Sequence, residues 1–455
     1  MTDARRKEAF ESLPVPKALA AFIVPTVLSQ LITMIYNLAD TFFVGHTGDT
    51  AQVAAMGIVT PVFLMMGMVS SIFGVGANAG VSAALGAGRR ERARQVASFS
   101  LWTGLGTICV FALLLSLFME PFLLVIGAGA RTLDYCISYL RWTFLLGCVP
   151  TVFSSLMGQL FLAEGESKIS GIGGALGGIL NILLDPLFIF TFRLGVTGAA
   201  IATMISNCVT AIFYLTVYFR RRKNMVLRLH PRHWSGRDGV ASSVLLIGIP
   251  SGFALLLTTV CDFVRTHFIG LLGTDVDMAA FGVVLRVGNL LIGLSVGMAQ
   301  GIRPLVAYNH ASGDRARMKA LMKGSAVVVA SFVVFFTALL EVGARQVMGF
   351  FLTDGETVAL GASYMRKYVI CQLGICGADL ISAFFQAMGK WKHAMFLTFM
   401  NKALLLTPAT ILLVHLWGLI GVVWVQPITE NLTLLIAIVL FAVTLRRMAG
   451  QRLQN

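Results

Sequence analysis

The sequence predicts an all-α integral membrane protein with twelve transmembrane helices, arranged as two parallel repeats of six helices each. Three observations support this fold class. Only 12% of the 455 residues are charged, whereas 57% are hydrophobic, and the mean hydropathy is +0.83. Positive residues gather in every second connection between apolar segments, and the second half of the chain repeats the first. Soluble proteins contain about 25% charged residues, so lipid must surround most of this chain.

Twelve apolar segments are long enough to cross a bilayer, whose core needs about 20 helical residues. Because a backbone in lipid must satisfy its own hydrogen bonds, each segment is expected to be a helix. The predicted spans are residues 17–44, 54–84, 95–118, 138–162, 168–192, 197–219, 241–270, 279–307, 321–343, 364–388, 393–415 and 419–444.

The distribution of Lys and Arg predicts which connections are cytoplasmic. These residues gather in both tails and in the connections 89–94, 220–240 and 315–323. The connections 45–51 and 271–277 contain none. Positive loops stay on the cytoplasmic side, so both tails are expected there, which requires an even number of spans. The net charge of +14 is therefore a topology signal, and we expect no nucleic-acid partner.

A shift of 225 residues aligns the second half of the chain with the first. Pro25 falls on Pro250, and residues 45–57 fall on residues 270–282. Two six-helix units with the same orientation are related by an axis along the membrane normal and enclose a central cavity. The predicted organisation is a cytoplasmic tail 1–16, an N-lobe 17–219, a cytoplasmic basic linker 220–240, a C-lobe 241–444 and a cytoplasmic tail 445–455.

Polar residues inside the predicted spans are costly and are therefore candidates for function. Asp40 lies in the first span, and Asn181 and Asp185 lie four residues apart on one face of the fifth. At 1.5 Å per residue, Asp40 and Asp185 lie at a similar depth to Thr203 in the sixth span. The four side chains are expected to form one cluster that binds a proton or a Na⁺ ion. A structural hydrogen-bond network that fixes helix packing is the alternative.

Other residues are secondary candidates. Tyr36 and Asn37 lie one turn before Asp40, and Pro25 favours a kink in the same span. The second half contains a buried polar set, in which internal pairing competes with a role in attracting a cationic substrate: Asp262, Arg265, Arg286, Arg303, Asp379, Lys402 and Glu430. The candidates for a substrate cavity are Asp262, Asp379, Glu430, Met65 and Met298.

These motifs together resemble those of the multidrug and toxic compound extrusion (MATE) family of secondary transporters, over about residues 17–445. The motifs are Pro25, Tyr36-Asn37-Leu38-Ala39-Asp40, residues 45–57 with their repeat at 270–282, and Asn181-Ile182-Leu183-Leu184-Asp185-Pro186. The resemblance implies export of small organic, often cationic, compounds across the bacterial inner membrane in exchange for H⁺ or Na⁺, without another cofactor.

The resemblance is closer to the DinF-like than to the NorM-like branch of this family. In the DinF-like branch, an N-lobe coupling site uses residues that match Asp40, Asn181, Asp185 and Thr203. The NorM-like branch has a Glu eight residues after the proline of the seventh span, where this chain has Thr258. The resemblance therefore implies coupling through the N-lobe.

Two other functions compete with export. A flippase of lipid-linked oligosaccharides shares the architecture and tends to line its cavity with cations, for which Arg286, Arg303 and Lys402 are candidates. A membrane-embedded enzyme should contain a motif such as DDxxD or HExxH, and the sequence contains neither. We therefore expect a monomeric transporter of small organic compounds in a lipid bilayer, and not an enzyme.

Overall fold

The computed structural model describes residues 7–450, nearly all of them helical, and the side chains of residues 7–448. The first half contains η1 (Glu8–Ser12), α2 (Val15–Gly45), α3 (Thr50–Ile58), α4 (Thr60–Gly86), α5 (Arg90–Val125), α6 (Leu133–Leu140), η2 (Arg141–Leu146), α7 (Cys148–Ala163), α8 (Ser167–Pro186), η3 (Leu187–Thr191) and α9 (Gly195–Arg221). The second half contains η4 (Pro231–His233), α10 (Val240–Leu272), α11 (Asp275–Ser312), α12 (Arg315–Phe351), α13 (Gly355–Val369), α14 (Cys371–Ala387), α15 (Trp391–Phe399), η5 (Met400–Leu406), α16 (Thr407–Trp417) and α17 (Leu419–Gly450).

The number of membrane spans agrees with the sequence. Within the described part of the chain, 11 helical segments are long and apolar enough to cross a bilayer, and a bent pair makes up to 12. The bent pair consists of residues Leu133–Leu146 and Cys148–Ala163, which meet at 47°. Gly147 lies at the break, and Pro150 follows it without a backbone N–H to donate to the preceding turn. The predicted fold class is confirmed.

Some helix ends differ from the predicted boundaries. The last span was expected to end at residue 444, whereas α17 continues to Gly450. Arg446 and Arg447 lie in this extension, where positive charge is favourable at a helix C-terminus and the helix can leave the bilayer. Residues 1–6 and 451–455 of the two predicted tails lie outside the described residues.

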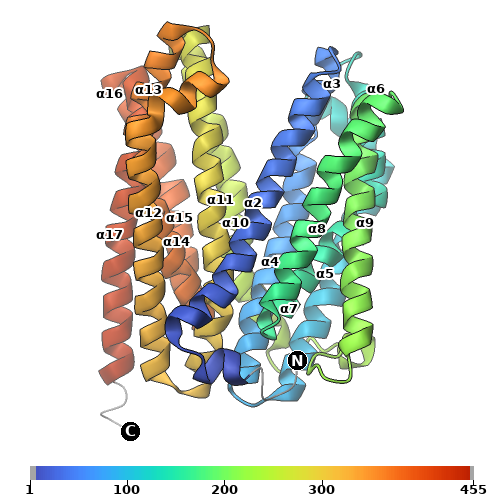
Figure 1. Cartoon of the computed structure of the whole chain (residues 1–455), viewed down its shortest axis with the longest axis vertical. Helices are drawn as coiled ribbons and strands as arrows, with labels where there is room; N and C mark the ends of the chain where they lie inside the picture. The colour runs from blue at the N-terminus through green and yellow to red at the C-terminus, as the bar shows by residue number, and fades with distance from the viewer. Residues whose placement is uncertain (1–6, 451–455) are drawn as a thin grey trace.

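The helices form two bundles that meet at one end of the molecule and diverge toward the other. Figure 1 shows α2–α9 in blue to green and α10–α17 in yellow-green to red, meeting at the lower end of the view, where α2 begins. The two bundles contact each other mainly through α4 with α10 and α2 with α11. They correspond to the predicted N-lobe and C-lobe, names that we keep for them.

Glycines allow this close contact between the lobes. A Cβ atom on Gly248 of α10 would lie only 1.8 Å from the Ile72 carbonyl oxygen of α4. A Cβ atom on Gly86 of α4 would lie 2.1 Å from the Tyr308 carbonyl oxygen of α11. Small residues of this kind let membrane helices touch backbone to backbone. The lobes are therefore tightly packed at the end where α2 begins, and separated at the end where α2 joins α3.

The predicted basic linker carries an apolar run that packs against the N-lobe. Met225, Val226, Leu227 and Leu229 are buried. The indole N–H of Trp102 in α5 donates to the Leu229 carbonyl oxygen at 3.0 Å. The linker is thus attached to the N-lobe at the end where the two lobes meet.

Candidate functional site

The site in the N-lobe begins with the packing of α2 against α8. Three glycines of α8 face α2, one turn apart. A Cβ atom on Gly171 would lie 2.6 Å from Pro25 Cβ, and one on Gly178 would lie 2.5 Å from Ile32 Cγ2. Gly174 lies between them, and its Cβ would be 2.0 Å from Ser29 Oγ. The missing side chains bring the two helices close enough for Asp40 to face the end of α8.

The structure brings Asp40, Asn181, Asp185 and Thr203 together. Asp40 is 6% exposed, Asn181 2% and Asp185 0%. With its nitrogen toward α2, the Asn181 amide donates to Asp40 Oδ1 at 3.1 Å and accepts from Thr203 Oγ1 at 3.2 Å. Asp40 lies close enough to Asp185 for the two carboxyl groups to act on each other electrostatically. We call these four residues the carboxyl cluster.

The carboxyl cluster has the chemistry of a proton site or a small-cation site. Two carboxyl groups can hydrogen-bond only when one of them carries a proton, because two carboxylates offer acceptors alone. Their charges also repel in a buried site, so holding one proton between them lowers the electrostatic cost. Among the described residues, no group of three or more His, Cys, Asp or Glu side chains could hold a metal ion. The oxygens of the cluster would suit only a hard ion such as Na⁺.

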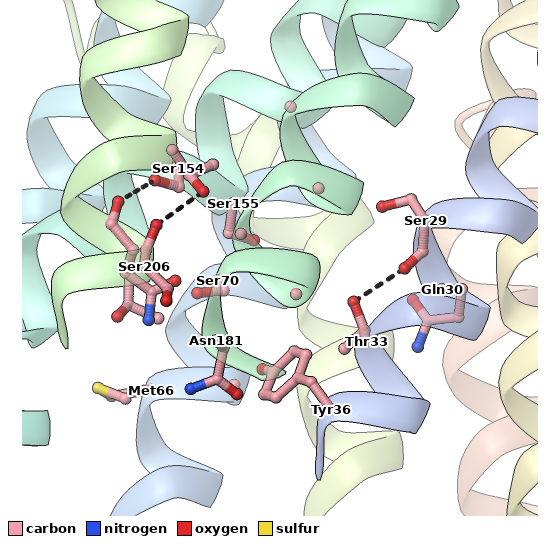
Figure 2. Close-up of a pocket in the computed structure, with 18 of the residues that line it drawn as sticks. Ser29, Gln30, Thr33, Tyr36, Met66, Ser70, Ser154, Ser155, Asn181 and Ser206 are labelled. Atoms are coloured by element: carbon pink, nitrogen blue, oxygen red, sulfur yellow. Dashed lines mark hydrogen bonds between the residues drawn. The ribbon is translucent and has the colours of Figure 1, made fainter. Parts of the chain in front are cut away.

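A cavity of about 630 Å³ lies directly beside the carboxyl cluster. Figure 2 shows Tyr36 and Asn181 at one end of it, with Ser29 and Thr33 on one side and Ser154 and Ser206 on the other. Its wall comes from α2, α4, α7, α8 and α9, with Leu255 of α10 and Gln300 of α11 added by the C-lobe. Asn181, Thr203 and Tyr36 line the cavity, whereas Asp40 and Asp185 lie behind them.

The predicted accessory residues have different surroundings. Tyr36 and Asn37 line the cavity, while Pro25 packs against Gly171. Met66 lines the cavity, but its neighbour Met65 does not. The other predicted cavity residues are also absent from this wall: Met298, Asp262, Asp379 and Glu430.

The charged residues of the C-lobe are largely paired with one another. Glu430, which is 1% exposed, accepts hydrogen bonds from Lys402 Nζ at 2.9 Å and from Asn401 Nδ2 at 2.8 Å. Arg265 forms an ion pair with Asp262. This arrangement agrees with the internal-pairing interpretation of the sequence.

The other three predicted members of the polar set in the C-lobe differ in their surroundings. Asp379 is close enough for Lys402, Glu430 and Arg303 to act on it electrostatically. The prediction was wrong for Arg286, which is exposed rather than buried. Its segment is apolar on most sides, so the sequence did not reveal which face of α11 it occupies.

Sequence reasoning missed most of the cavity wall. Hydroxyl and amide side chains dominate it, including Ser70 and Ser71 of α4 and Ser155 of α7. Gln159 of α7 donates to Gln300 of α11 at 3.1 Å and so joins the two lobes. Serine is common in membrane helices, where it often bonds to its own backbone, so single serines carry little information. The adjacent pairs Ser70-Ser71 and Ser154-Ser155 were the available signal.

Comparisons with known proteins place the chain in a family. The MatE family model matches residues 25–187 and again residues 250–412, one match in each lobe. Multidrug export protein MepA of Staphylococcus aureus (strain MSSA476) is 30% identical over 433 residues, which cover 95% of this chain and 94% of that protein. The protein of the same name in Staphylococcus saprophyticus is 29% identical over 436 residues, again with 95% and 94% coverage.

A solved structure described as the outward-facing conformation of a multidrug resistance MATE family transporter has the same fold. It superposes with a TM-score of 0.92 at 22% identity, over 99% of this chain and 100% of that one. The family match in both lobes, the MepA relatives and this fold agree with the predicted resemblance. The chain belongs to the MATE family of transporters.

Proposed function

We propose that this protein is a proton-coupled antiporter that exports small organic compounds, cationic ones among them, from the cytoplasm of a bacterial cell. The MepA relatives are multidrug exporters by name, and the chain covers nearly their whole length. The two lobes, and an N-lobe cavity whose wall also includes Leu255 and Gln300 of the C-lobe, suit alternating access, in which one lobe rocks against the other.

The observation that carries the proposal is the wall shared by the carboxyl cluster and the cavity. Asn181 donates a hydrogen bond to Asp40 and accepts one from Thr203. Both Asn181 and Thr203 also line the cavity. A change in the charge of Asp40 can therefore affect a compound bound in the cavity through the Asn181 side chain. A deprotonated Asp40 accepts a hydrogen bond from the Asn181 amide, whereas a protonated one can donate. Protonation of Asp40 would favour rotation of the Asn181 amide, so that its oxygen faces Asp40. The hydrogen-bonding group that Asn181 presents to the cavity would then change.

The tight packing of the two lobes at the end where α2 begins defines the first state of the proposed transport cycle. The tails and the basic linker are proposed to be cytoplasmic, because Lys and Arg gather there. The lobes then meet on the cytoplasmic side, and the cavity opens outward. Entry of a proton from outside to Asp40 or Asp185 would weaken the binding of the exported compound, which is then released. Rocking of the lobes and proton release to the cytoplasm would reset the site.

The cavity wall disfavours the flippase alternative. A lipid-linked oligosaccharide carries a diphosphate, which needs Arg or Lys for recognition. None of Arg286, Arg303 and Lys402 lines the cavity. Lys402 is held by Glu430, and Arg303 is only 6% exposed. The site thus favours transport of compounds without phosphate groups.

Ethidium accumulation in bacterial cells that lack their own efflux pumps tests the proposed export. Cells expressing the protein should accumulate less dye than cells with an empty vector, and a protonophore should abolish the difference. Equal accumulation in both strains, with the protein present in the membrane, would contradict the proposal.

A further inference from the structure

We propose that the cavity recognises an uncharged, hydroxyl-rich part of the exported compound, of the kind a glycoside carries. This inference rests on the proposed export function and specifies its substrate class. No charged side chain belongs to the cavity wall that the described residues form. Serine, threonine, asparagine, glutamine and tyrosine make up most of it. Ligand pockets are usually lined mainly by apolar and aromatic side chains, so this wall is unusual.

Several of these polar side chains have no hydrogen-bond partner among the described residues. Gln30, Ser70, Ser71, Ser155 and Asn207 line the cavity, and none of their side chains forms a hydrogen bond within the described chain. They come from four helices, α2, α4, α7 and α9, and so surround a bound molecule from different directions. Donors and acceptors are therefore available around the cavity rather than at one point.

Other hydroxyls of the wall keep an acceptor site for a ligand. Thr33 donates to the Ser29 carbonyl oxygen at 3.0 Å, and Ser154 donates to that of Asn207 at 3.2 Å. Each of these bonds uses the single hydroxyl hydrogen and leaves a lone pair on the oxygen. A sugar hydroxyl both donates and accepts, so it can match either kind of group. A compound without such groups would displace water and leave wall groups unpaired, which is costly.

The wall itself carries no charged side chain, so a cationic group of the compound would be attracted only by the carboxyl groups behind the wall. The nearest carboxyl groups, Asp40 and Asp185, are 6% and 0% exposed and lie behind Asn181. Phe63, Met66 and Leu255, together with the glycines and the carbon atoms of the polar side chains, supply the apolar part of the wall. The cavity therefore suits a compound that combines several hydroxyl groups with a small ring system.

Two coumarins that differ in one substituent provide the test: 4-methylumbelliferyl β-glucoside and 7-methoxy-4-methylcoumarin. Both are uncharged and share one ring system, but only the first carries sugar hydroxyls. Binding to the purified full-length protein is measured by equilibrium dialysis in a detergent without a sugar headgroup. We expect the glucoside to bind at least tenfold more tightly. The triple variant Ser70→Ala, Ser71→Ala, Ser155→Ala should lose at least tenfold in glucoside affinity and little for the methyl ether.

Ser116→Ala is the matched control, because Ser116 is exposed on α5 and its hydroxyl donates to the Leu113 carbonyl oxygen. This variant should bind the glucoside like the wild type. Equal affinity for the two coumarins, or no binding of the glucoside to the wild-type protein, overturns the inference even if the triple variant fails to fold. Ethidium efflux is measured in parallel and reports on the proposed export alone. Efflux without glucoside preference would leave that function standing and remove the proposed substrate class.

Discussion

The Asn181 amide lies between the buried carboxyl group of Asp40 and the cavity, the two sites that an ion-coupled transporter must connect. On one side it contacts Asp40, and on the other it reaches Thr203 and the cavity. Its four-residue spacing from Asp185 and the similar depth of Asp40 were visible in the sequence, which is why these residues could be predicted as neighbours. The sequence could not predict that both carboxyl groups are screened from the cavity, because this depends on how α2 and α8 are rotated about their axes relative to each other.

Replacement of either carboxyl group tests its part in coupling. Asp40→Asn and Asp185→Asn should each reduce gradient-driven efflux to the level of membranes without the protein, because an amide cannot take up and release the proton. Expression and thermal stability should change little, since Asn keeps the shape and can still hydrogen-bond. Asp134→Asn, at an exposed position in α6, is the control and should transport normally. Wild-type efflux rates in both buried variants would show that the carboxyl cluster is structural.

The ion pairs of the C-lobe are predicted to stabilise the fold rather than bind substrate. Lys402→Met leaves Glu430, which is 1% exposed, without its ionic partner, and Glu430→Met leaves the ammonium group unpaired. Breaking one side of a buried pair costs about 3–5 kcal/mol, whereas replacing both partners with apolar residues costs much less.

Thermal unfolding of the purified variants measures this difference. Both single variants should melt well below the wild type, and the double variant should recover most of the loss and keep ethidium efflux. Arg221→Met removes the exposed partner of the pair with Glu166 and should change stability by no more than about 1 kcal/mol. Loss of efflux in a stable double variant would instead place this pair in the transport pathway.

At the scale of the helices, the glycines of α8 determine where the carboxyl cluster forms. Hydropathy predicted the span itself, because most of residues 168–192 are apolar or glycine. It did not indicate which face of the helix would meet α2. Helices that are apolar all round carry no 3.6-residue period to reveal the buried side. The same limit explains the error at Arg286.

Gly178→Ala tests whether this close approach of α2 and α8 is needed. The added Cβ atom would lie 2.5 Å from Ile32 Cγ2 and 3.1 Å from Tyr36 Cδ1, so α2 must move or Ile32 must change rotamer. Overpacking of this kind costs about 1–3 kcal/mol and would separate Asp40 from Asn181. We expect a folded protein with efflux reduced severalfold. Gly106→Ala in α5, where nothing lies within 4 Å of the new atom, should transport like the wild type.

At the scale of the whole molecule, the internal repeat predicted two lobes, and the family model matches once in each. The repeat could not predict their relative position, because both arrangements of an alternating-access protein have the same sequence and helices. Contacts such as Gln159 with Gln300 belong only to the arrangement seen here. They arise from residues 141 positions apart, which no local pattern connects.

The orientation of the molecule in the membrane is a prediction from Lys and Arg. Single cysteines at His46 and Leu272, which are exposed near the ends of α2 and α10, should react with an impermeant maleimide in intact cells. A cysteine at Asn224 in the basic linker should react only after the membrane is permeabilised. Labelling of the parent protein gives the background from the native cysteines. The reverse pattern would invert the assignment of inside and outside.

The choice of coupling ion depends on what the carboxyl cluster offers to each candidate. A proton needs one carboxyl group that can hold and release it, and the carboxyl cluster contains two buried ones, Asp40 and Asp185. Sodium needs several oxygens at fixed distances, and here the Asn181 nitrogen occupies one of the positions next to Asp40. A pH difference of one unit supplies about 1.4 kcal/mol per proton, enough for roughly tenfold accumulation in a one-for-one exchange.

Inside-out vesicles in buffer without Na⁺ separate the two ions. With an acidic lumen, protons leave through the transporter while ethidium enters, so the dye should accumulate in the lumen. Because an electroneutral exchange of one proton for one monovalent cation uses only the pH term, clamping the membrane potential with K⁺ and valinomycin should leave accumulation unchanged. Exchange of two protons per dye would make it sensitive to the potential. Addition of Na⁺ on both sides should have no effect. Accumulation that appears only with an imposed Na⁺ gradient, and is lost in Asp40→Asn, would assign the same residues to sodium.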